Sequence, residues 1–176
     1  REAGARFARA ALRIRERAVA GGRPLCLIAG GETTVTMRGR APGGRSGGGG
    51  RGGGRGGRNL ELALGAAAVL RGEPGVWILS FATDGWDGTS GAAGAYATGS
   101  TWARALRLRR NPDRAFASND TAPLFRALGD LLMTGPSGTN VNDITVALVA
   151  PPPRRPARRA RSRKSPPRTR PARSPA

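Results

Sequence analysis

Apolar residues recur along this chain with two different spacings, which separate predicted helices from predicted strands. In residues 2–20 they lie three or four positions apart, with arginines between them, which is the pattern of an amphipathic helix. In residues 25–29 they form a short, continuous run, which is typical of a strand buried on both faces. The two patterns predict strands at 25–29, 33–37, 76–82, 131–133 and 144–149, and helices at 2–20, 60–71, 100–109, 113–118 and 121–129. Because strands alternate with helices, we expect an α/β fold, a layered sheet with flanking helices.

Two segments interrupt this pattern, because residues 39–57 and 151–176 contain no Leu, Ile, Val or Phe. The first holds 12 glycines and four arginines, and the second holds ten cations and no acidic residue. Together they account for most of the net charge of +19, and segments of this composition cannot bury enough apolar surface to fold. We therefore expect one domain, residues 1–150, that contains a disordered Gly/Arg-rich insertion at 39–57 and precedes a disordered basic tail at 151–176.

Composition also sets aside several classes of protein and site. No apolar run approaches the roughly 20 residues that span a bilayer, so we expect no membrane association and a cytoplasmic location. Since the chain has no histidine and one cysteine, zinc sites and histidine-dependent triads within it are excluded. Cys26 lies in the apolar run 25–29, which predicts a buried structural thiol in a reducing compartment. The first residue is not methionine, which suggests that an upstream part is missing.

The arginine-rich tracts favour weak contacts with nucleic acid. Arg51 and Arg55 have the spacing of RGG repeats, and the tail could bind RNA or DNA through phosphates. Neither tract contains an aromatic residue on which a base could stack. The chain has 29 arginines and one lysine, a bias that a GC-rich coding sequence would also produce. The tail therefore predicts nonspecific electrostatic binding.

Glycine-supported polar loops adjoin the predicted strands and helices. In 30–34 two glycines follow a strand, so backbone amides could approach an anion, although a plain turn has the same pattern. In 56–59 Arg58 stands at a predicted helix start, where it could bind a phosphate or carboxylate or merely solvate the helix end.

Two further loops are rich in groups that bind cations or hydroxyls. In 83–88, Asp84 and Asp87 could hold Mg²⁺ or accept hydrogen bonds from hydroxyls, although an Asx-rich turn has the same composition. The loop 134–143 is equally polar and could converge on the same edge of the sheet.

Taken in order, these loops resemble the MOFRL domain, the C-terminal domain of the ATP-dependent glycerate 2-kinases, which are also labelled hydroxypyruvate reductases. The matching segments are CLIAGGETTVT at 26–36, GGRNLELA at 56–63, TDGWDG at 83–88, AAGA at 92–95 and TGPSGTNVND at 134–143. The resemblance covers residues 1–150 apart from the Gly/Arg tract. Several motifs in the same order are a more specific signal than any one of them alone.

This resemblance implies phosphoryl transfer from ATP to the 2-hydroxyl of D-glycerate, with Mg²⁺, in a cleft between two domains. A missing N-terminal domain would carry a catalytic lysine and much of the nucleotide site, and the single lysine here, Lys164, lies in the tail. The family's motifs place Arg58 and Asp84 in catalysis and Asp84 and Asp87 at the metal. The substrate-binding residues that they imply are Gly30, Gly31, Glu32, Thr33, Asn59, Asp87, Thr139, Asn140 and Asn142.

Three positions depart from the family's pattern. Leu60 replaces the usual Gln after Arg-Asn, Gly91 replaces the usual Asp before Ala-Ala-Gly-Ala, and the Gly/Arg tract replaces a short connection. With the N-terminal domain absent, we expect the chain alone to be inactive. The alternatives are a nonenzymatic basic protein that binds nucleic acid through its tracts and a structural remnant without activity.

Overall fold

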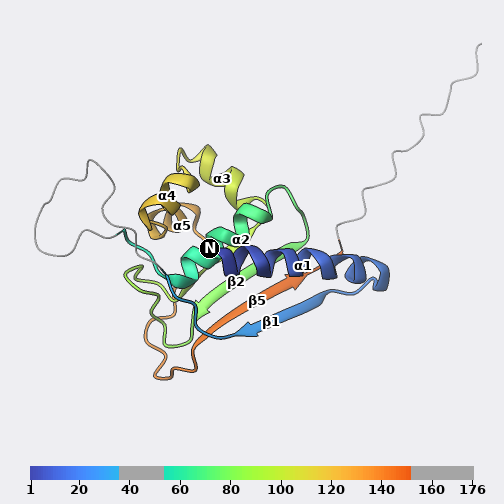
Figure 1. Cartoon of the computed structure of the whole chain (residues 1–176), viewed down its shortest axis with the longest axis horizontal. Coiled ribbons are helices and arrows are strands. Elements are labelled where there is room, and N and C mark those ends of the chain that lie inside the picture. Colours follow the sequence, from blue (N-terminus) through green and yellow to red (C-terminus); the bar gives the residue numbers. More distant parts are fainter. Residues whose placement is uncertain (36–53, 152–176) are drawn as a thin grey trace, which may run out of the picture.

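The computed structural model describes residues 1–35 and 54–151, which contain five helices and five strands in the order α1-β1-α2-β2-β3-α3-α4-α5-β4-β5 (Figure 1). The helices are α1 (Glu2–Gly21), α2 (Arg58–Val69), α3 (Thr101–Arg107), α4 (Pro112–Ser118) and α5 (Ala122–Leu128). The strands are β1 (Leu25–Gly30), β2 (Val76–Ala82), β3 (Gly94–Thr98), β4 (Leu131–Leu132) and β5 (Asp143–Val149). Within the described ranges no helix is long and apolar enough to cross a membrane.

The strands form one antiparallel sheet in the order β1-β5-β2-β3-β4. β5 is an interior strand that pairs with β1 on one side and β2 on the other, so that Gly30 and Phe81 both lie opposite Ile144. Because antiparallel neighbours run in opposite directions, the ends of β1 and β2 lie beside the start of β5. The loops that follow β1 and β2 therefore meet the loop that precedes β5.

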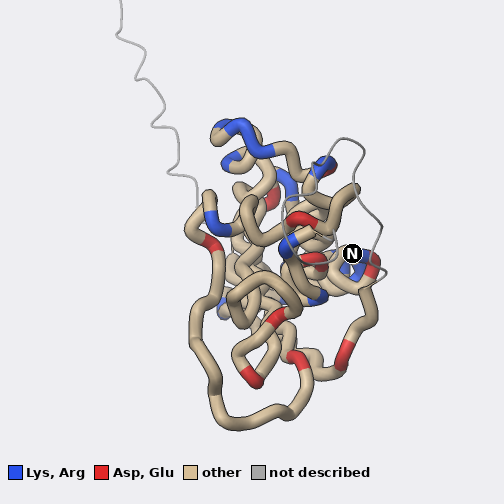
Figure 2. The backbone as a smooth tube through the Cα atoms, turned by 90° about the vertical axis from the view of Figure 1, so that its left-hand side faces the viewer, with Lys and Arg blue, Asp and Glu red and all other residues tan. Residues whose placement is uncertain are grey.

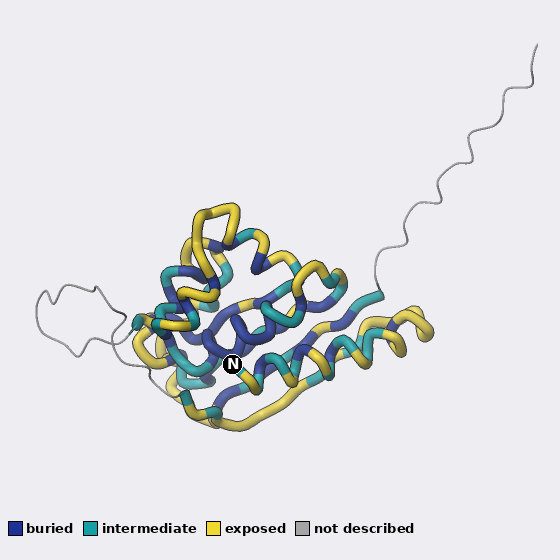
Figure 3. Tube along the Cα trace, turned by 45° about the horizontal axis from the view of Figure 1, so that its top comes forward, coloured by how far each residue is buried: buried dark blue, intermediate teal, exposed yellow. Residues whose placement is uncertain are grey.

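Helices α1 and α2 lie side by side on one face of this sheet (Figure 1). Their backbones approach closely at two glycines: a Cβ on Gly4 would lie 1.9 Å from the Leu62 carbonyl oxygen, and one on Gly65 would lie 2.3 Å from that of Arg1. Helix α2 is buried over most of its length because α1, the sheet and α3–α5 surround it (Figure 3). Its positions are accordingly apolar on nearly every side.

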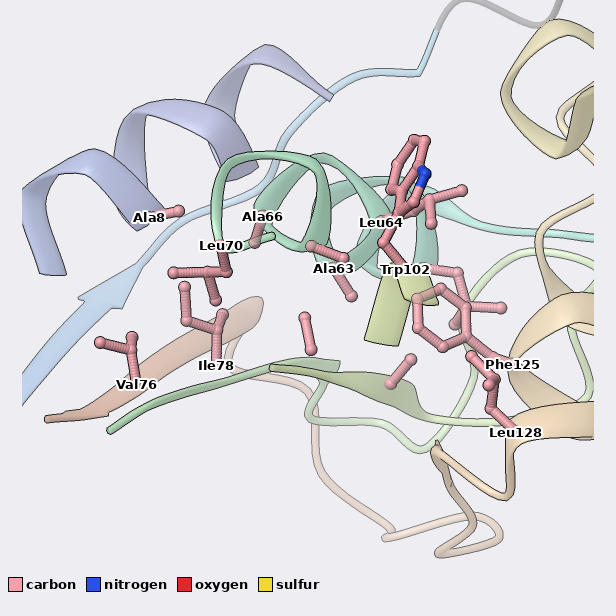
Figure 4. Packing of buried hydrophobic residues seen from close by; sticks show 14 of the residues in the cluster. Ala8, Ala63, Leu64, Ala66, Leu70, Val76, Ile78, Trp102, Phe125 and Leu128 are labelled. Atoms are coloured by element: carbon pink, nitrogen blue, oxygen red, sulfur yellow. The ribbon is translucent and has the colours of Figure 1, made fainter. Parts of the chain in front are cut away.

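The hydrophobic core lies between α2 and the sheet and continues toward α3 and α5 (Figure 4). Leu64 of α2, Leu70 directly after it, and Val76 and Ile78 of β2 are all at most 1% exposed, and Phe125 of α5 closes the far end. Many remaining core positions are alanines, which allow the layers to approach closely. The α/β fold class predicted from the alternation of helices and strands is confirmed.

Three local predictions differ from the structure. β3 was not predicted, because its residues GAYAT show no run of large apolar side chains. Residues 33–35 form no strand, and the rest of the strand predicted at 33–37 lies outside the described residues. Cys26 is exposed rather than buried, because the helices cover one face of the sheet and Cys26 lies on the other face.

The end of the Gly/Arg tract is packed against the domain. The Arg55 amide donates to Asp120 Oδ1 at 2.9 Å, and the Gly56 carbonyl accepts from the Thr89 amide at 2.9 Å. Residues 54–57 of the segment predicted to be disordered thus have defined contacts. The remainder of that tract, and the tail from residue 152, lie outside the described residues.

Candidate functional site

Three loops meet at the end of the sheet where β1 and β2 finish and β5 begins. The Gly31 amide donates to the Asp143 carbonyl at 3.1 Å, and the Thr83 amide donates to the Asn142 carbonyl at 3.3 Å. The loops 31–35, 83–88 and 134–142 contain three acidic residues and no lysine or arginine. The lowest loops in Figure 2 accordingly carry red segments and no blue ones. In a strongly basic chain, this end of the domain is locally acidic.

Arg58 is the cation at the centre of this acidic end. It begins α2, and its guanidinium binds Asp143 through two hydrogen bonds, Nε to Oδ2 at 2.5 Å and NH2 to Oδ1 at 2.8 Å. Its third nitrogen, NH1, lies 3.5 Å from Glu32 Oε1. The Asp143 hydrogen bond raises the pKa of Arg58, with smaller contributions from the charges of Asp143 and Glu32, while burial opposes the rise. Arg58 is therefore a fixed, permanently charged group with one nitrogen held less tightly than the others.

The start of α2 is capped by Asp87 from the loop after β2. Asp87 is fully buried, and its Oδ1 accepts hydrogen bonds from the Asn59 amide at 3.0 Å and from Asn59 Nδ2 at 3.3 Å. Its Oδ2 accepts from the Leu60 amide at 2.9 Å. Burial raises the pKa of Asp87, while the hydrogen bonds and the Arg58 charge lower it. Asp87 was expected to bind substrate and metal, but its contacts are those of a helix cap.

Asn59 ties this cap to the sheet. It is 1% exposed, and its Oδ1 accepts a hydrogen bond from Ser80 Oγ at 2.6 Å. Ser80 Oγ in turn lies 3.1 Å from Thr145 Oγ1 of β5. This buried chain of polar groups fixes the start of α2 relative to β2 and β5, and with it the position of Arg58. Ser80 and Thr145 were not predicted as site residues, since a small hydroxyl residue in a strand gives no signal of its partner.

A hollow of about 490 Å³ opens beside the Arg58–Asp143 pair, between the start of α1 and the end of β1. Its lining includes five predicted substrate-binding residues, Gly30, Gly31, Glu32, Thr33 and Asn59, together with Asp143. From the helices, it is lined by Ala3, Arg6, Phe7 and Leu62. Asp143 was missed as a site residue, although it ends the last family motif. The hollow is large enough for a small anion, with carboxylates, a guanidinium and an apolar side around it.

The remaining predicted residues form a second group that ties the other two loops together. Asp84 Oδ1 accepts from the Trp86 amide at 2.9 Å, and Asp84 Oδ2 lies 3.4 Å from Asn140 Nδ2. The Thr139 amide donates to Ser137 Oγ, and the Asn142 amide donates to Asn140 Oδ1 at 3.0 Å. None of these four predicted residues, Asp84, Thr139, Asn140 and Asn142, is among those that line the hollow.

The two loops approach at Gly85, whose φ of 92° is in the range that favours glycine. A Cβ there would lie 2.0 Å from the Gly135 carbonyl oxygen, so a larger residue would push the loops apart. Their close contact therefore depends on this glycine.

The expected magnesium site does not form from the described residues alone. They include no group of three or more His, Cys, Asp and Glu residues that could hold a metal ion. Asp87 has both carboxylate oxygens occupied by hydrogen bonds from α2, which leaves Asp84 as the accessible carboxylate of its loop. Mg²⁺ takes six oxygen ligands and is commonly held by one or two carboxylates together with waters and substrate phosphates, so Asp84 would supply one ligand and the metal site stays a prediction.

Comparison with known proteins shows what the chain is similar to. Residues 25–143 match the sequence profile of the MOFRL family. The chain is 40% identical over 127 residues to D-glycerate 2-kinase of Thermotoga maritima, a match that covers 72% of this chain and 27% of that relative. It is 35% identical over 126 residues to glycerate 2-kinase of Pyrococcus horikoshii, covering 72% of this chain and 26% of that relative.

A solved structure has a similar fold. The crystal structure of glycerate kinase from Thermotoga maritima superposes with a TM-score of 0.68 at 38% identity, and the match covers 85% of this chain and 33% of that structure. The chain thus spans a third or less of the length of these relatives.

Proposed function

This chain belongs to the MOFRL family, and we propose that it is the C-terminal domain of a glycerate 2-kinase, which transfers a phosphoryl group from ATP to the 2-hydroxyl of D-glycerate. The observation that carries the proposal is Arg58, held by Asp143 at the start of α2 beside a hollow lined by the family's first loop. Such a group suits a reaction whose catalysis depends mainly on positioning and on neutralising charge.

Arg58 has a contact that an anionic substrate could replace. Asp143 occupies its Nε and NH2, whereas NH1 faces Glu32 at 3.5 Å, and the Glu32 side chain is 55% exposed. A carboxylate or phosphoryl oxygen in the hollow would take the place of Glu32 at NH1 and gain a charge-assisted hydrogen bond. Asp143 is then a positioning residue that fixes the plane of the guanidinium, and Glu32 stands where the substrate oxygen binds.

The charges of this site explain why we expect the chain to need the rest of the enzyme. Glycerate and ATP bring several negative charges, while the two carboxylates of the hollow, Glu32 and Asp143, already balance the two nearby cations, Arg6 and Arg58. We therefore expect the further cations that these substrates need to come from the part of the relatives that this chain does not match. We propose no step that involves a metal, because the described residues supply an incomplete donor set for it.

A chimera tests this function. The chain is fused to the unmatched part of the Thermotoga maritima relative, and formation of 2-phosphoglycerate from ATP and D-glycerate is followed in a coupled assay. We expect activity in the fusion and none in the unfused chain. Arg58→Ala should lower kcat/KM on the order of 10³-fold, since it removes a charge that stabilises the transferring group, and Arg58→Lys should restore only part of it.

Arg104→Ala is the matched control. Arg104 also binds an aspartate through two nitrogens, at 2.9 and 3.0 Å from Asp130, with a similar side-chain exposure of 32%. Asp130 does not line the hollow, whereas the Arg58 partners Glu32 and Asp143 do. Loss of the Arg104 side chain should lower stability and leave kcat/KM nearly unchanged. Equal activity of the Arg58→Ala and unchanged fusions would refute the role of Arg58, and turnover by the unfused chain would refute the need for a second domain.

A further inference from the structure

The face of the sheet turned away from α1 and α2 is apolar and carries no charge. Residues directly opposite each other in an antiparallel sheet share a face, so the strand register defines this face row by row. The rows are Cys26, Leu148, Trp77 and Thr98; Ile28, Val146, Leu79 and Tyr96; and Gly30, Ile144, Phe81 and Gly94. We call these twelve positions the open face.

Several large side chains of the open face are exposed. Ile28 is 67% exposed, Trp77 and Leu148 are each 47% exposed, and Tyr96 is 41% exposed. On the opposite face of the same strands, Ile78, Ala147 and Val149 are at most 1% exposed because α1 and α2 cover them. A contiguous apolar patch on a sheet marks an interaction surface, since leaving it in water is unfavourable.

The tracts outside the described residues do not have the composition to cover this face. Residues 36–53 and 152–176 contain no Leu, Ile, Val, Phe, Tyr or Trp, and their one larger apolar residue is Met37.

The candidate site lies on the helix side of the sheet, since α1 and α2 line its hollow, and Gly30 stands at the edge between the hollow and the open face. In the enzyme proposed above, the part that completes the site would therefore approach from the helix side. This direction of approach is the one point here that rests on the proposed function, and it leaves the open face available to a different partner.

We propose that the open face binds the open face of a second copy of this chain, so that two sheets pack face to face about a two-fold axis. Such an interface is self-complementary, because the same patch is used on both subunits. The absence of charge matters here: two chains of net charge +19 meet over a surface on which neither brings a like charge. Branched aliphatic and aromatic side chains interdigitate well between sheets about 10 Å apart.

The size of the open face sets the strength of this dimer. Four strands about 4.8 Å apart, each with three positions about 7 Å apart, give a patch of roughly 400 Å² in projection. That is below the roughly 800 Å² per partner of a standard stable interface. We therefore expect reversible association in the micromolar range and a monomer at high dilution.

Cys26 provides a direct reporter, since it is the one cysteine of the chain and lies exposed on the open face. The full chain is examined by sedimentation velocity from about 1 to about 200 μM at constant salt, and the rate of Cys26 labelling by a maleimide is measured over the same range. We expect the mass to rise to twice 18.2 kDa. At a concentration tenfold above the dissociation constant, labelling should be about fivefold slower than in the dilute chain, because about one fifth of the chains remain monomeric.

Outward-facing substitutions test the surface without touching the core. Trp77→Lys and Ile28→Lys should each keep the chain monomeric and make the labelling rate independent of concentration, with unchanged far-UV circular dichroism. Leu106→Lys is the control, since Leu106 on α3 is 54% exposed but lies outside the open face; this variant should dimerise like the unchanged chain. A chain that stays monomeric to about 200 μM would overturn the proposal, and so would a dimer that persists in both open-face variants.

Discussion

Asp84 and Asp87 are two aspartates of the same loop, and their substitution by asparagine should have very different effects on stability. Asp87→Asn keeps the size of the side chain but replaces one acceptor oxygen by an NH₂ group. Both oxygens of Asp87 accept buried hydrogen bonds from the start of α2, so the new NH₂ must face an N–H donor at a distance of about 3 Å whichever way the amide turns. Asp84 has exposed contacts, and its amide could turn toward water.

The magnitude follows from these contacts. Leaving one buried donor without an acceptor costs about 1–3 kcal/mol, and removing the negative charge from a helix N-terminus costs up to about 2 kcal/mol in a buried geometry. Relief of the buried charge offsets part of this loss, so we expect Asp87→Asn to lower the free energy of unfolding by about 3 kcal/mol. Asp84→Asn should cost less than about 1 kcal/mol, since its oxygens are partly hydrated.

Urea titration of the full chain, followed by far-UV circular dichroism, measures both values. For a domain of this size, a loss of about 3 kcal/mol corresponds to a fall in Tm of roughly 10 °C, which a thermal scan resolves easily. A loss below about 1 kcal/mol for Asp87→Asn, or an equal loss for the two variants, would refute the capping role of Asp87. It would also return Asp87 to the candidates for metal or substrate binding.

Two further predictions concern stability. Gly4→Ala should destabilise the domain by about 1–3 kcal/mol, because the new methyl group would overlap the Leu62 carbonyl. The control is Gly21→Ala at the other end of α1, where a methyl group meets nothing within 4 Å and should be neutral or slightly stabilising. Similar urea midpoints for the two variants would contradict the close contact of α1 and α2. Burial raises the pKa of Asp87, so the folded state binds a proton at this carboxylate more readily than the unfolded state does. The stability that Asp87 contributes should therefore grow as pH falls through the raised pKa toward the ordinary value of about 3.9, and shrink as pH rises. The difference in unfolding free energy between the unchanged chain and Asp87→Asn should thus be larger at about pH 4.5 than at about pH 7, and the opposite trend would show that the hydrogen bonds outweigh burial.

Most helices and strands could be predicted because their own residues carry the pattern. The three-to-four spacing in residues 2–20 gives α1, and the apolar runs give β2 and β5 within a residue or so of their observed bounds. The family motifs likewise identified the loops that meet at the end of the sheet. Local sequence could indicate these features since periodicity and turn chemistry depend on neighbouring residues.

Features that depend on neighbours distant in the sequence could not be predicted. β3 is a strand because β2 pairs with it, and a Cβ on its Gly94 would lie only 1.9 Å from the Ser80 carbonyl; its own Gly and Ala residues give little signal. The apolar run around Cys26 indicated a covered strand, but Cys26 and Ile28 lie on the face of the sheet that no helix covers and are therefore exposed.

The loop TDGWDG shows, within one motif, the same contrast between what local sequence indicates and what distant neighbours decide. Its sequence placed two aspartates three residues apart beside a strand end, which is as far as local chemistry extends. Only the tertiary structure decided that Asp87 is buried under the start of α2 while Asp84 remains partly exposed, and that Arg58 is fixed by Asp143, 85 residues along the chain. The composition of a segment determines which groups it can offer, but burial and partners belong to the packed chain, because they depend on what distant segments place against it.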